Sequence, residues 1–301
     1  MKSFLSYKCA FSLLFVAFVA VFVSCDQIGE GERYIAVTPV DTAGADTTGG
    51  VVPIRRAVLV EEFSGQLCVN CPAASEALEA MQEANGGPER IVVVSIHAGV
   101  GNMLAINQAM GQALGVEGLA TDFGEQLYSH YGLSSEPNAV IDRRSGVVSQ
   151  PQWLTTIINS LSRDVSVGLS LRTDYDSESR QLTVDVLGRT SGQGAYYGNV
   201  HVWLTEDSIV TMQRLSGGGY DYSHVFNSIF RASATPMAGE QVSIMPADEV
   251  QPIYTASVTL EGHWRPEKMA VVAFVDDASG VANVARAALL PAIDAGEADG
   301  E

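Results

Sequence analysis

A Cys-x-x-Cys pair at the start of a predicted helix is the feature that most constrains this chain. Residues 57–63 form a largely apolar run typical of a short buried strand, and Cys68 and Cys71 follow it closely. Beyond them, apolar residues recur at helical spacing, so the sequence predicts a helix over about 68–84. The cysteines therefore lie where a strand passes into a helix. The unpaired N–H groups and partial positive charge of a helix N-terminus stabilise a thiolate, so this position predicts a reactive thiol.

The N-terminal segment predicts export. Residues 1–24 have a basic start, an apolar stretch too short for a transmembrane helix, and a small residue before Cys25, which is the pattern of a secretory signal. The segment Phe22-Val23-Ser24-Cys25 is similar to a bacterial lipoprotein processing site, in which Cys25 becomes the lipidated first residue. Phe22 stands where Leu is usual. The alternative is an uncleaved anchor or a signal cut elsewhere, and both alternatives leave the bulk of the protein exported.

The remaining cysteines indicate redox chemistry. If Cys9 leaves with the signal and Cys25 carries lipid, Cys68 and Cys71 are alone in the folded body. An exported domain that is stabilised by disulfides normally has more cysteine pairs at wider spacing. So tight a pair closes almost no loop and adds little chain-entropy stabilisation. A redox couple therefore explains the pair better than its alternative, a permanently oxidised disulfide in a domain that serves as a scaffold.

Composition favours a globular protein and argues against nucleic-acid binding. The chain has 301 residues, enough for two domains, and 47% apolar with 17% charged residues is typical of a chain that forms a core. Its formal net charge of -18 repels phosphate backbones, so no nucleic-acid partner is expected. The predicted parts are a signal peptide (1–24), a lipidated tether (25–53), a first domain (54–163), a second domain (164–293) and an acidic tail (294–301).

The hydrophobic period separates the two predicted domains. In the first, a strand, a helix and a second strand over 90–96 make a βαβ unit. Helical segments between 99 and 132, a hairpin over 138–148 and a last helix from 151 complete an α/β domain. From Val165 onward, apolar residues alternate with polar ones with a period of two. The pattern predicts seven or eight strands in an all-β immunoglobulin-like sandwich.

With these residues in place, the first domain resembles a thioredoxin fold. The resemblance rests on the strand before the cysteines, the Cys-x-x-Cys at a helix start, and Glu136-Pro137 ahead of a hairpin and a C-terminal helix. It implies that Pro137 is cis and packs against the cysteine pair. It also implies that Glu62, six positions before Cys68, is a buried acid that exchanges a proton near Cys71.

As a redox couple, the two cysteines are expected to have different roles. Cys68, nearer the helix start and more exposed, attacks a substrate disulfide as a thiolate, and Cys71 resolves the mixed disulfide. Pro72 departs from the Lys or Arg that usually follows the second cysteine of thioredoxins. This removes a positive charge and an N–H group, which argues against a strongly reducing role.

The whole architecture is similar to the outer membrane protein 28-related lipoproteins of Bacteroidetes, and the run Val202-Trp203-Leu204-Thr205-Glu206-Asp207 strengthens the match. The resemblance covers nearly all of the chain after the signal. It implies a lipid-anchored outer-membrane protein, periplasmic or surface-exposed, in a family whose biochemical activity is poorly defined.

No cofactor or metal site is expected. Paired thiolates bind copper or zinc, but the histidines show no ligand spacing with each other or with the cysteines. The histidines are His97, His130, His201, His224 and His263.

Two classes of function remain open. A redox protein would act on protein thiols or disulfides. The competing class is a non-enzymatic surface adhesion or receptor-associated lipoprotein in which the disulfide is structural. For that class, Tyr220 and Tyr222 beside a glycine run form a candidate exposed contact loop.

Overall fold

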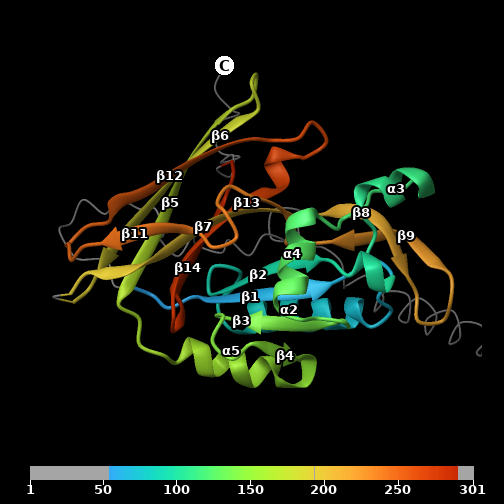
Figure 1. The fold of residues 1–301 in the computed structure, drawn as a ribbon, viewed down its shortest axis with the longest axis horizontal. Coiled ribbons are helices and arrows are strands. Elements are labelled where there is room, and N and C mark those ends of the chain that lie inside the picture. The colour runs from blue at the N-terminus through green and yellow to red at the C-terminus, as the bar shows by residue number, and fades with distance from the viewer. Residues whose placement is uncertain (1–53, 193, 291–301) are drawn as a thin grey trace, which may run out of the picture. The chain divides into compact units, whose positions relative to one another are not determined.

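The computed structural model describes residues 54–192 and 194–290, all of them within one compact unit (Figure 1). The predicted signal peptide, Cys25, the tether and the acidic tail lie outside the described residues. Most of the regular structure is β, in mixed sheets, with four α-helices among the described residues.

Residues 54–163 alternate strands with helices. The elements are β1 (Val58–Ser64), α2 (Cys71–Ala84), β2 (Ile91–His97), α3 (Gln108–Leu114), α4 (Asp122–His130), β3 (Asn138–Ile141), β4 (Val147–Ser149) and α5 (Trp153–Leu161), with short 3-10 turns at Val100–Asn102 and Gln150–Gln152. Strands β1 and β2 are parallel, whereas β3 is antiparallel to β1 and β4 is antiparallel to β3. The predicted helix over 68–84 begins at Cys71.

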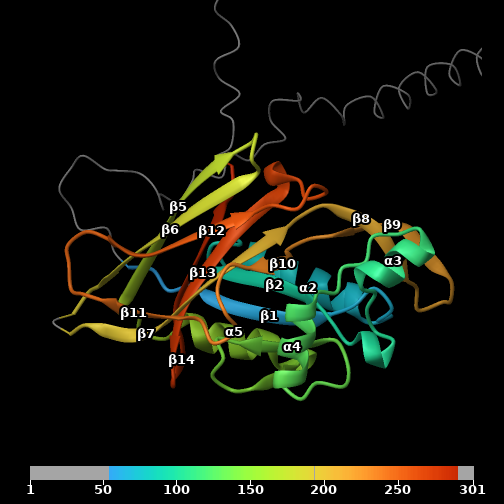
Figure 2. The ribbon, with the colours of Figure 1, turned by 45° about the horizontal axis from the view of Figure 1, so that its top comes forward.

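Strands β1 and β2 are buried along their whole length, as their apolar runs predict for central parallel strands. Alternate side chains point to opposite faces of the sheet. Val58 and Val60 pack with α2 and α5 on one face. Leu59 and Phe63 pack on the other face, where α4 contributes Leu127. Figure 2 shows the sheet with helices on both sides.

Residues 164–290 are almost entirely strands. The elements are β5 (Val167–Asp176), β6 (Gln181–Thr190), β7 (Tyr196–Glu206), β8 (Ile209–Arg214), β9 (Tyr220–Phe226), β10 (Ile229–Ser233), β11 (Glu240–Ile244), β12 (Gln251–Thr259), β13 (Met269–Asp277) and β14 (Gly280–Ala288), with a 3-10 turn at Pro266–Lys268. The alternating pattern predicts seven or eight strands here, and the structure has ten, β5 to β14. The elements that the sequence missed lie between β7 and β12, where the strands are short and polar residues interrupt the alternation.

One sheet joins the two parts of the chain. Strand β10 runs parallel to β2, with Ile229 opposite Ser95, and Ser95 N–H donates to the Ser228 carbonyl at 2.8 Å. The resulting nine-stranded sheet has the order β14-β13-β7-β10-β2-β1-β3-β4, with β11 also paired to β7. The alternation along β7 divides the core: Trp203 packs with β1, β2 and α4, whereas Val202 and Leu204 point to the opposite face.

The three-stranded sheet β12-β6-β5 packs against the face that carries Val202 and Leu204. This gives two facing β layers with an apolar core between them. Strands β8 and β9 form a separate two-stranded hairpin, which lies beside α3 in both views (Figures 1 and 2). Its buried Ile209 and Phe226 pack with Leu119 and with Ile229 at the start of β10, so the hairpin is anchored to the large sheet.

Candidate functional site

The two cysteines form a disulfide in the turn between β1 and α2. Cys71 is the first residue of α2, and Pro72 follows in the first helical turn, where a missing N–H group breaks no helical hydrogen bond. Cys68 lies in the turn before the helix. The order strand, disulfide, helix that the sequence predicts is therefore present.

Both cysteines are buried. The exposed fraction is 4% for Cys68 and 2% for Cys71, so Cys68 is not the open thiol that the sequence reading expects. Strand β8 contacts the cysteine turn, because Gln213 Nε2 donates to the Cys68 carbonyl at 2.9 Å. The hairpin also corrects the expected contact loop: Tyr220 and Tyr222 lie on strand β9, both exposed, with their ring centroids 6.3 Å apart.

Gln66 fixes the hairpin to the cysteine turn. Its fully buried side chain donates to the carbonyls of Glu117 (2.9 Å) and Met212 (3.2 Å) and accepts from Leu119 N–H (3.0 Å). Its backbone carbonyl accepts from Arg214 N–H at 2.8 Å. Each of these bonds joins the turn to a segment that is distant in sequence, so one side chain holds three segments together at the disulfide.

Glu136 is the residue that the structure adds to the site. The peptide bond between Glu136 and Pro137 is cis. A carboxylate oxygen of Glu136 and the sulfur atoms of Cys68 and Cys71 all lie within 4.8 Å of one another. Both oxygens of Glu136 are buried without a hydrogen-bond partner. Burial, reinforced by the charges of Glu125 and Glu62, raises the pKa of Glu136 to about 9.

The close approach of Glu136 depends on a glycine. A Cβ atom on Gly65 would lie 2.8 Å from Glu136 Oε2 and 2.2 Å from the Leu104 carbonyl oxygen, so a side chain does not fit there. The sequence signal for Glu136 is its position directly before Pro137, although the thioredoxin resemblance concerns the proline alone.

Glu62 is a buried acid on β1, as the resemblance implies. Its Oε1 accepts from Ser75 Oγ at 2.7 Å. Burial raises the pKa of Glu62 to about 7, and hydrogen bonds from Ser75 and Ser95 oppose the shift. Glu62 is not part of the group formed by Cys68, Cys71 and Glu136.

The ionisable groups around the disulfide are acidic. In the described part of the chain, no Lys, Arg or His forms an ion pair with Glu62 or Glu136. The start of α2 favours a thiolate, whereas nearby carboxylates disfavour it. The nucleophilicity of either cysteine therefore depends on the protonation of its acidic neighbours.

The histidines do not come together at this site. His97 ends β2 and packs edge-to-face against Phe226 at 5.2 Å, where burial, with smaller effects of Arg231 and His224, lowers its pKa to about 3. His201 is buried against Asp276, with Nε2 and Oδ1 3.1 Å apart. Neither lies in the group around the cysteines.

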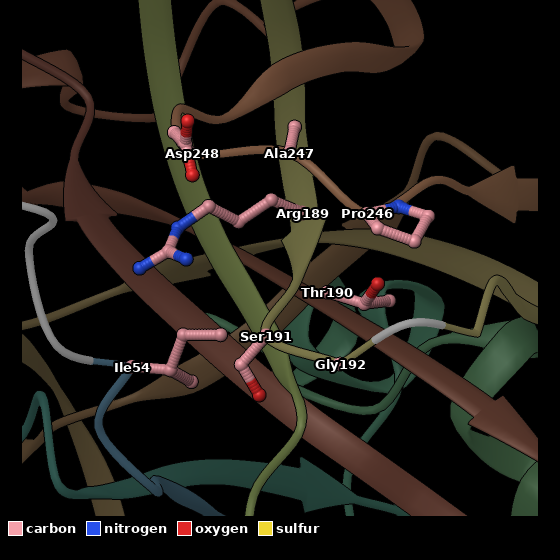
Figure 3. Close-up of a pocket in the computed structure, with 8 residues that line it drawn as sticks. All are labelled: Ile54, Arg189, Thr190, Ser191, Gly192, Pro246, Ala247 and Asp248. Atoms are coloured by element: carbon pink, nitrogen blue, oxygen red, sulfur yellow. The ribbon is translucent and has the colours of Figure 1, made fainter.

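A separate surface pocket of about 450 Å³ lies at the end of β6 (Figure 3). Its lining residues are Ile54, Arg189, Thr190, Ser191, Gly192, Pro246, Ala247 and Asp248. Figure 3 shows that they come from the β6 end, the segment before β12 and the start of the described chain. None of them belongs to the disulfide site, so the pocket and the potentially reactive side chains lie in different parts of the structure. We place the candidate site at the disulfide, because two sulfur atoms and a carboxyl group converge there.

The fold and the site together define a β-rich protein with mixed sheets and a disulfide between a strand and a helix. The sequence model of the family described as outer membrane protein Omp28 matches residues 124–292, more than half of the chain. The chain therefore belongs to this family and is an outer membrane protein. The match includes Glu136 and Pro137 but begins after the cysteines, so family membership alone carries no information about the disulfide.

A solved structure supports the fold. HBP35 of Porphyromonas gingivalis is similar with a TM-score of 0.57 and 15% sequence identity, over 79% of this chain and 76% of that chain. At this identity the likeness concerns the fold alone. No curated protein matches the chain in sequence.

None of the described helices is both long and apolar enough to cross a membrane.

Proposed function

We propose that this chain is a lipid-anchored outer-membrane protein whose first part is thioredoxin-like and performs thiol-disulfide exchange. The observation that carries the proposal is the Cys68–Cys71 disulfide at the start of α2, with the cis peptide bond before Pro137 on the neighbouring strand segment. The strand order β2-β1-β3-β4, parallel and then antiparallel, with helices on both faces, supports the thioredoxin-like part. The two facing β layers support an immunoglobulin-like sandwich after it.

The exchange conserves atoms and electrons. In the reduced protein, the Cys68 thiolate attacks one sulfur of a substrate disulfide, and the other substrate sulfur leaves as a thiolate that takes up a proton. Cys71 then attacks Cys68 in the mixed disulfide and releases the second substrate thiol. The substrate gains two electrons and the protein pair becomes the disulfide. Glu62, with its pKa near 7, accepts the proton of Cys71 in this scheme.

The anchor is the lipid on Cys25. Its support is the segment Phe22-Val23-Ser24-Cys25 and the outer-membrane family of the chain. A Cys25→Ala variant should appear in the soluble fraction after export. Continued membrane association of that variant would refute lipid anchoring through Cys25.

The test of exchange is the reduction potential together with the pKa of the Cys68 thiol. An active couple should have a potential above roughly -300 mV and a thiol pKa below about 8.5, and a Cys71→Ser variant should accumulate mixed disulfides. A Cys68→Ser variant is the matched control and should trap no partner. A potential below roughly -300 mV with an ordinary thiol pKa would mark a structural bridge.

A second function is favoured by the burial of both cysteines and by the hydrogen bond from the β8–β9 hairpin to the Cys68 carbonyl. In this alternative the disulfide is structural, and the chain binds a surface protein without catalysis. The exposed Tyr220 and Tyr222 are its contact residues. A Cys68→Ser variant should then keep the partner, whereas Tyr222→Ser should weaken binding, and the reverse result would exclude this alternative.

A further inference from the structure

Three metal-binding side chains converge at one point of the fold. Cys68, Cys71 and Glu136 each bring a ligand atom within 4.8 Å of the other two. No other group of three or more His, Cys, Asp or Glu side chains meets this condition in residues 54–192 and 194–290. We propose that the reduced cysteine pair and Glu136 form a redox-gated site for a divalent transition-metal ion, with Zn²⁺ as the best fit.

The donor set selects the ion. Two thiolates and one carboxylate make an S₂O set, which suits a borderline-soft ion that tolerates tetrahedral coordination. Zn²⁺ binds both donor types, whereas Mg²⁺ and Ca²⁺ require oxygen ligands and Cu⁺ prefers sulfur. Three protein ligands leave one position for water or another small ligand, as in open zinc sites.

The state of Glu136 is the second, independent observation. Both of its carboxylate oxygens are buried and have no hydrogen-bond partner. Buried polar atoms are normally paired, so an unpaired carboxyl group aimed at two sulfur atoms calls for a specific explanation. A metal ion bound between them would satisfy the carboxylate.

Charge complementarity supports a cation. In the described chain Glu62 and Glu136 lack an ion-pair partner, and Glu125 adds a third acidic group nearby. Reduction of the disulfide adds two groups that can each become negative. A divalent ion would offset the charge of the two thiolates and of the Glu136 carboxylate that bind it.

Oxidation state gates the site. In the disulfide, neither sulfur carries the negative charge that binds a metal ion. A dithiol reductant transfers two electrons and two protons to the disulfide, gives two cysteine thiols and is itself oxidised to a disulfide. Binding of Zn²⁺ then releases to solvent the two thiol protons and any proton that the Glu136 carboxyl group carries. The inference needs reduction by such an agent, but it does not need the turnover proposed above.

The experiment measures metal binding by the purified full chain in both oxidation states. The protein is reduced with a dithiol, freed of the reductant without air, and titrated with Zn²⁺ against a chromophoric chelator. We expect one equivalent of Zn²⁺ in the reduced protein and none in the oxidised protein. With Co²⁺ as the probe, a sulfur-to-metal charge-transfer band should appear only after reduction.

Variants separate this site from adventitious thiol binding. Glu136→Gln keeps the shape but removes the charged ligand, so it should weaken Zn²⁺ binding at least about tenfold. Glu76→Gln makes the same change at an exposed position on α2 and should leave the affinity unchanged. Glu136→Asp keeps the carboxylate on a shorter side chain and should bind between the two. Near-ultraviolet circular dichroism verifies that each variant is folded.

Two results would overturn the inference. One is Zn²⁺ binding of equal strength in the oxidised and reduced protein, or none in either. The other is equal affinity of the reduced wild type and a folded Glu136→Gln variant. Failure of the exchange assays with intact Zn²⁺ binding would remove the proposed function and leave this site standing.

Discussion

At the scale of single residues, buried acids near the disulfide set how stability depends on pH. Glu62 is fully buried with a pKa of about 7, against an ordinary value of 4.5. Between pH 4.5 and about 7, Glu62 therefore keeps its proton in the folded state but has lost it in the unfolded state. Stability contributed by this proton is present below pH 4.5 and is lost as the pH rises through about 7.

We expect Glu62→Gln to stabilise the protein at pH 8, because the amide stays neutral and still accepts from Ser75. The shift of the pKa from 4.5 to about 7 corresponds to about 3 kcal/mol. Denaturant unfolding at pH 4, 6 and 8 measures it: the variant should match the wild type at pH 4 and exceed it at pH 8. A constant difference across this range would show that Glu62 does not titrate as described.

Arg143 is the second residue on which a prediction rests. Its guanidinium group binds the fully buried Glu61 at 2.9 Å and Asp276 at 2.9 Å. It also lies over the rings of Phe274 (4.7 Å) and Trp203 (5.4 Å). One cation therefore joins β1 to β7 and β13 inside the core that the two parts of the chain share.

Arg143→Met should destabilise the protein by about 3–5 kcal/mol, because Glu61 would remain buried without a counter-charge. The control is Arg172→Met, since Arg172 is 69% exposed and 3.8 Å from Asp185. That change should alter the free energy of unfolding by less than about 0.5 kcal/mol. Equal effects of the two substitutions in urea unfolding would contradict the assignment.

Sequence reasoning finds residues whose role is local and misses those whose role depends on distant contacts. Cys68, Cys71 and the buried Glu62 follow from a strand before a helix. Gln66 and Gln213 carry no such signal, since their partners lie far along the chain. Glu136 has only its place beside a proline as a marker, and its burial against the sulfur atoms is a product of the tertiary fold.

At the scale of elements, the β8–β9 hairpin is bonded to the turn that carries the disulfide. From the sequence, the glycine run at 217–219 and the tyrosines after it indicate a loop. The short strands β8 and β9 on either side have no clear apolar alternation that would predict them. The buried positions Ile209, Gln213 and Phe226 show a strand only once their partners are known. By contrast, β1 and β2 are evident from sequence, because a fully buried strand is apolar along most of its length.

Gln66→Leu should weaken the contact between the β8–β9 hairpin and the cysteine turn. The variant loses three side-chain hydrogen bonds, each worth about 1 kcal/mol, and leaves their buried partners unpaired. If reduction requires the hairpin to lift, a loss of about 2–3 kcal/mol should make reduction by a dithiol roughly 30- to 140-fold faster under native conditions.

The matched control is Gln126→Leu on α4, whose exposed side chain makes one hydrogen bond within its own helix. Its reduction rate should equal that of the wild type, as followed by thiol labelling over time. An unchanged rate in Gln66→Leu would mean that the reductant reaches Cys68 without movement of the hairpin.

At the scale of the whole molecule, the shared sheet couples the two parts of the chain. Local patterns predict the layers of each part, but not the pairing of β10 with β2, since register between distant strands leaves no mark in the sequence. Trp203 shows the consequence: it lies on β7 and packs among side chains of α4, β10 and β13. Strands β1 and β2 add Leu59, Val92 and Val94 to the same core.

The shared core predicts a single unfolding transition, and the three tryptophans allow a direct test. Trp153 lies on α5 and Trp264 packs in the core of the facing β layers, so each reports on one part of the chain. In a Trp203→Phe background, Trp264→Phe leaves Trp153 as the reporter and Trp153→Phe leaves Trp264. Within each variant, the fluorescence midpoint in urea should coincide with that of far-ultraviolet circular dichroism, which follows the whole chain. Fluorescence midpoints that depart from the circular dichroism midpoint in opposite directions would show that the two parts unfold separately, and that the β2–β10 pairing joins them without making them cooperative.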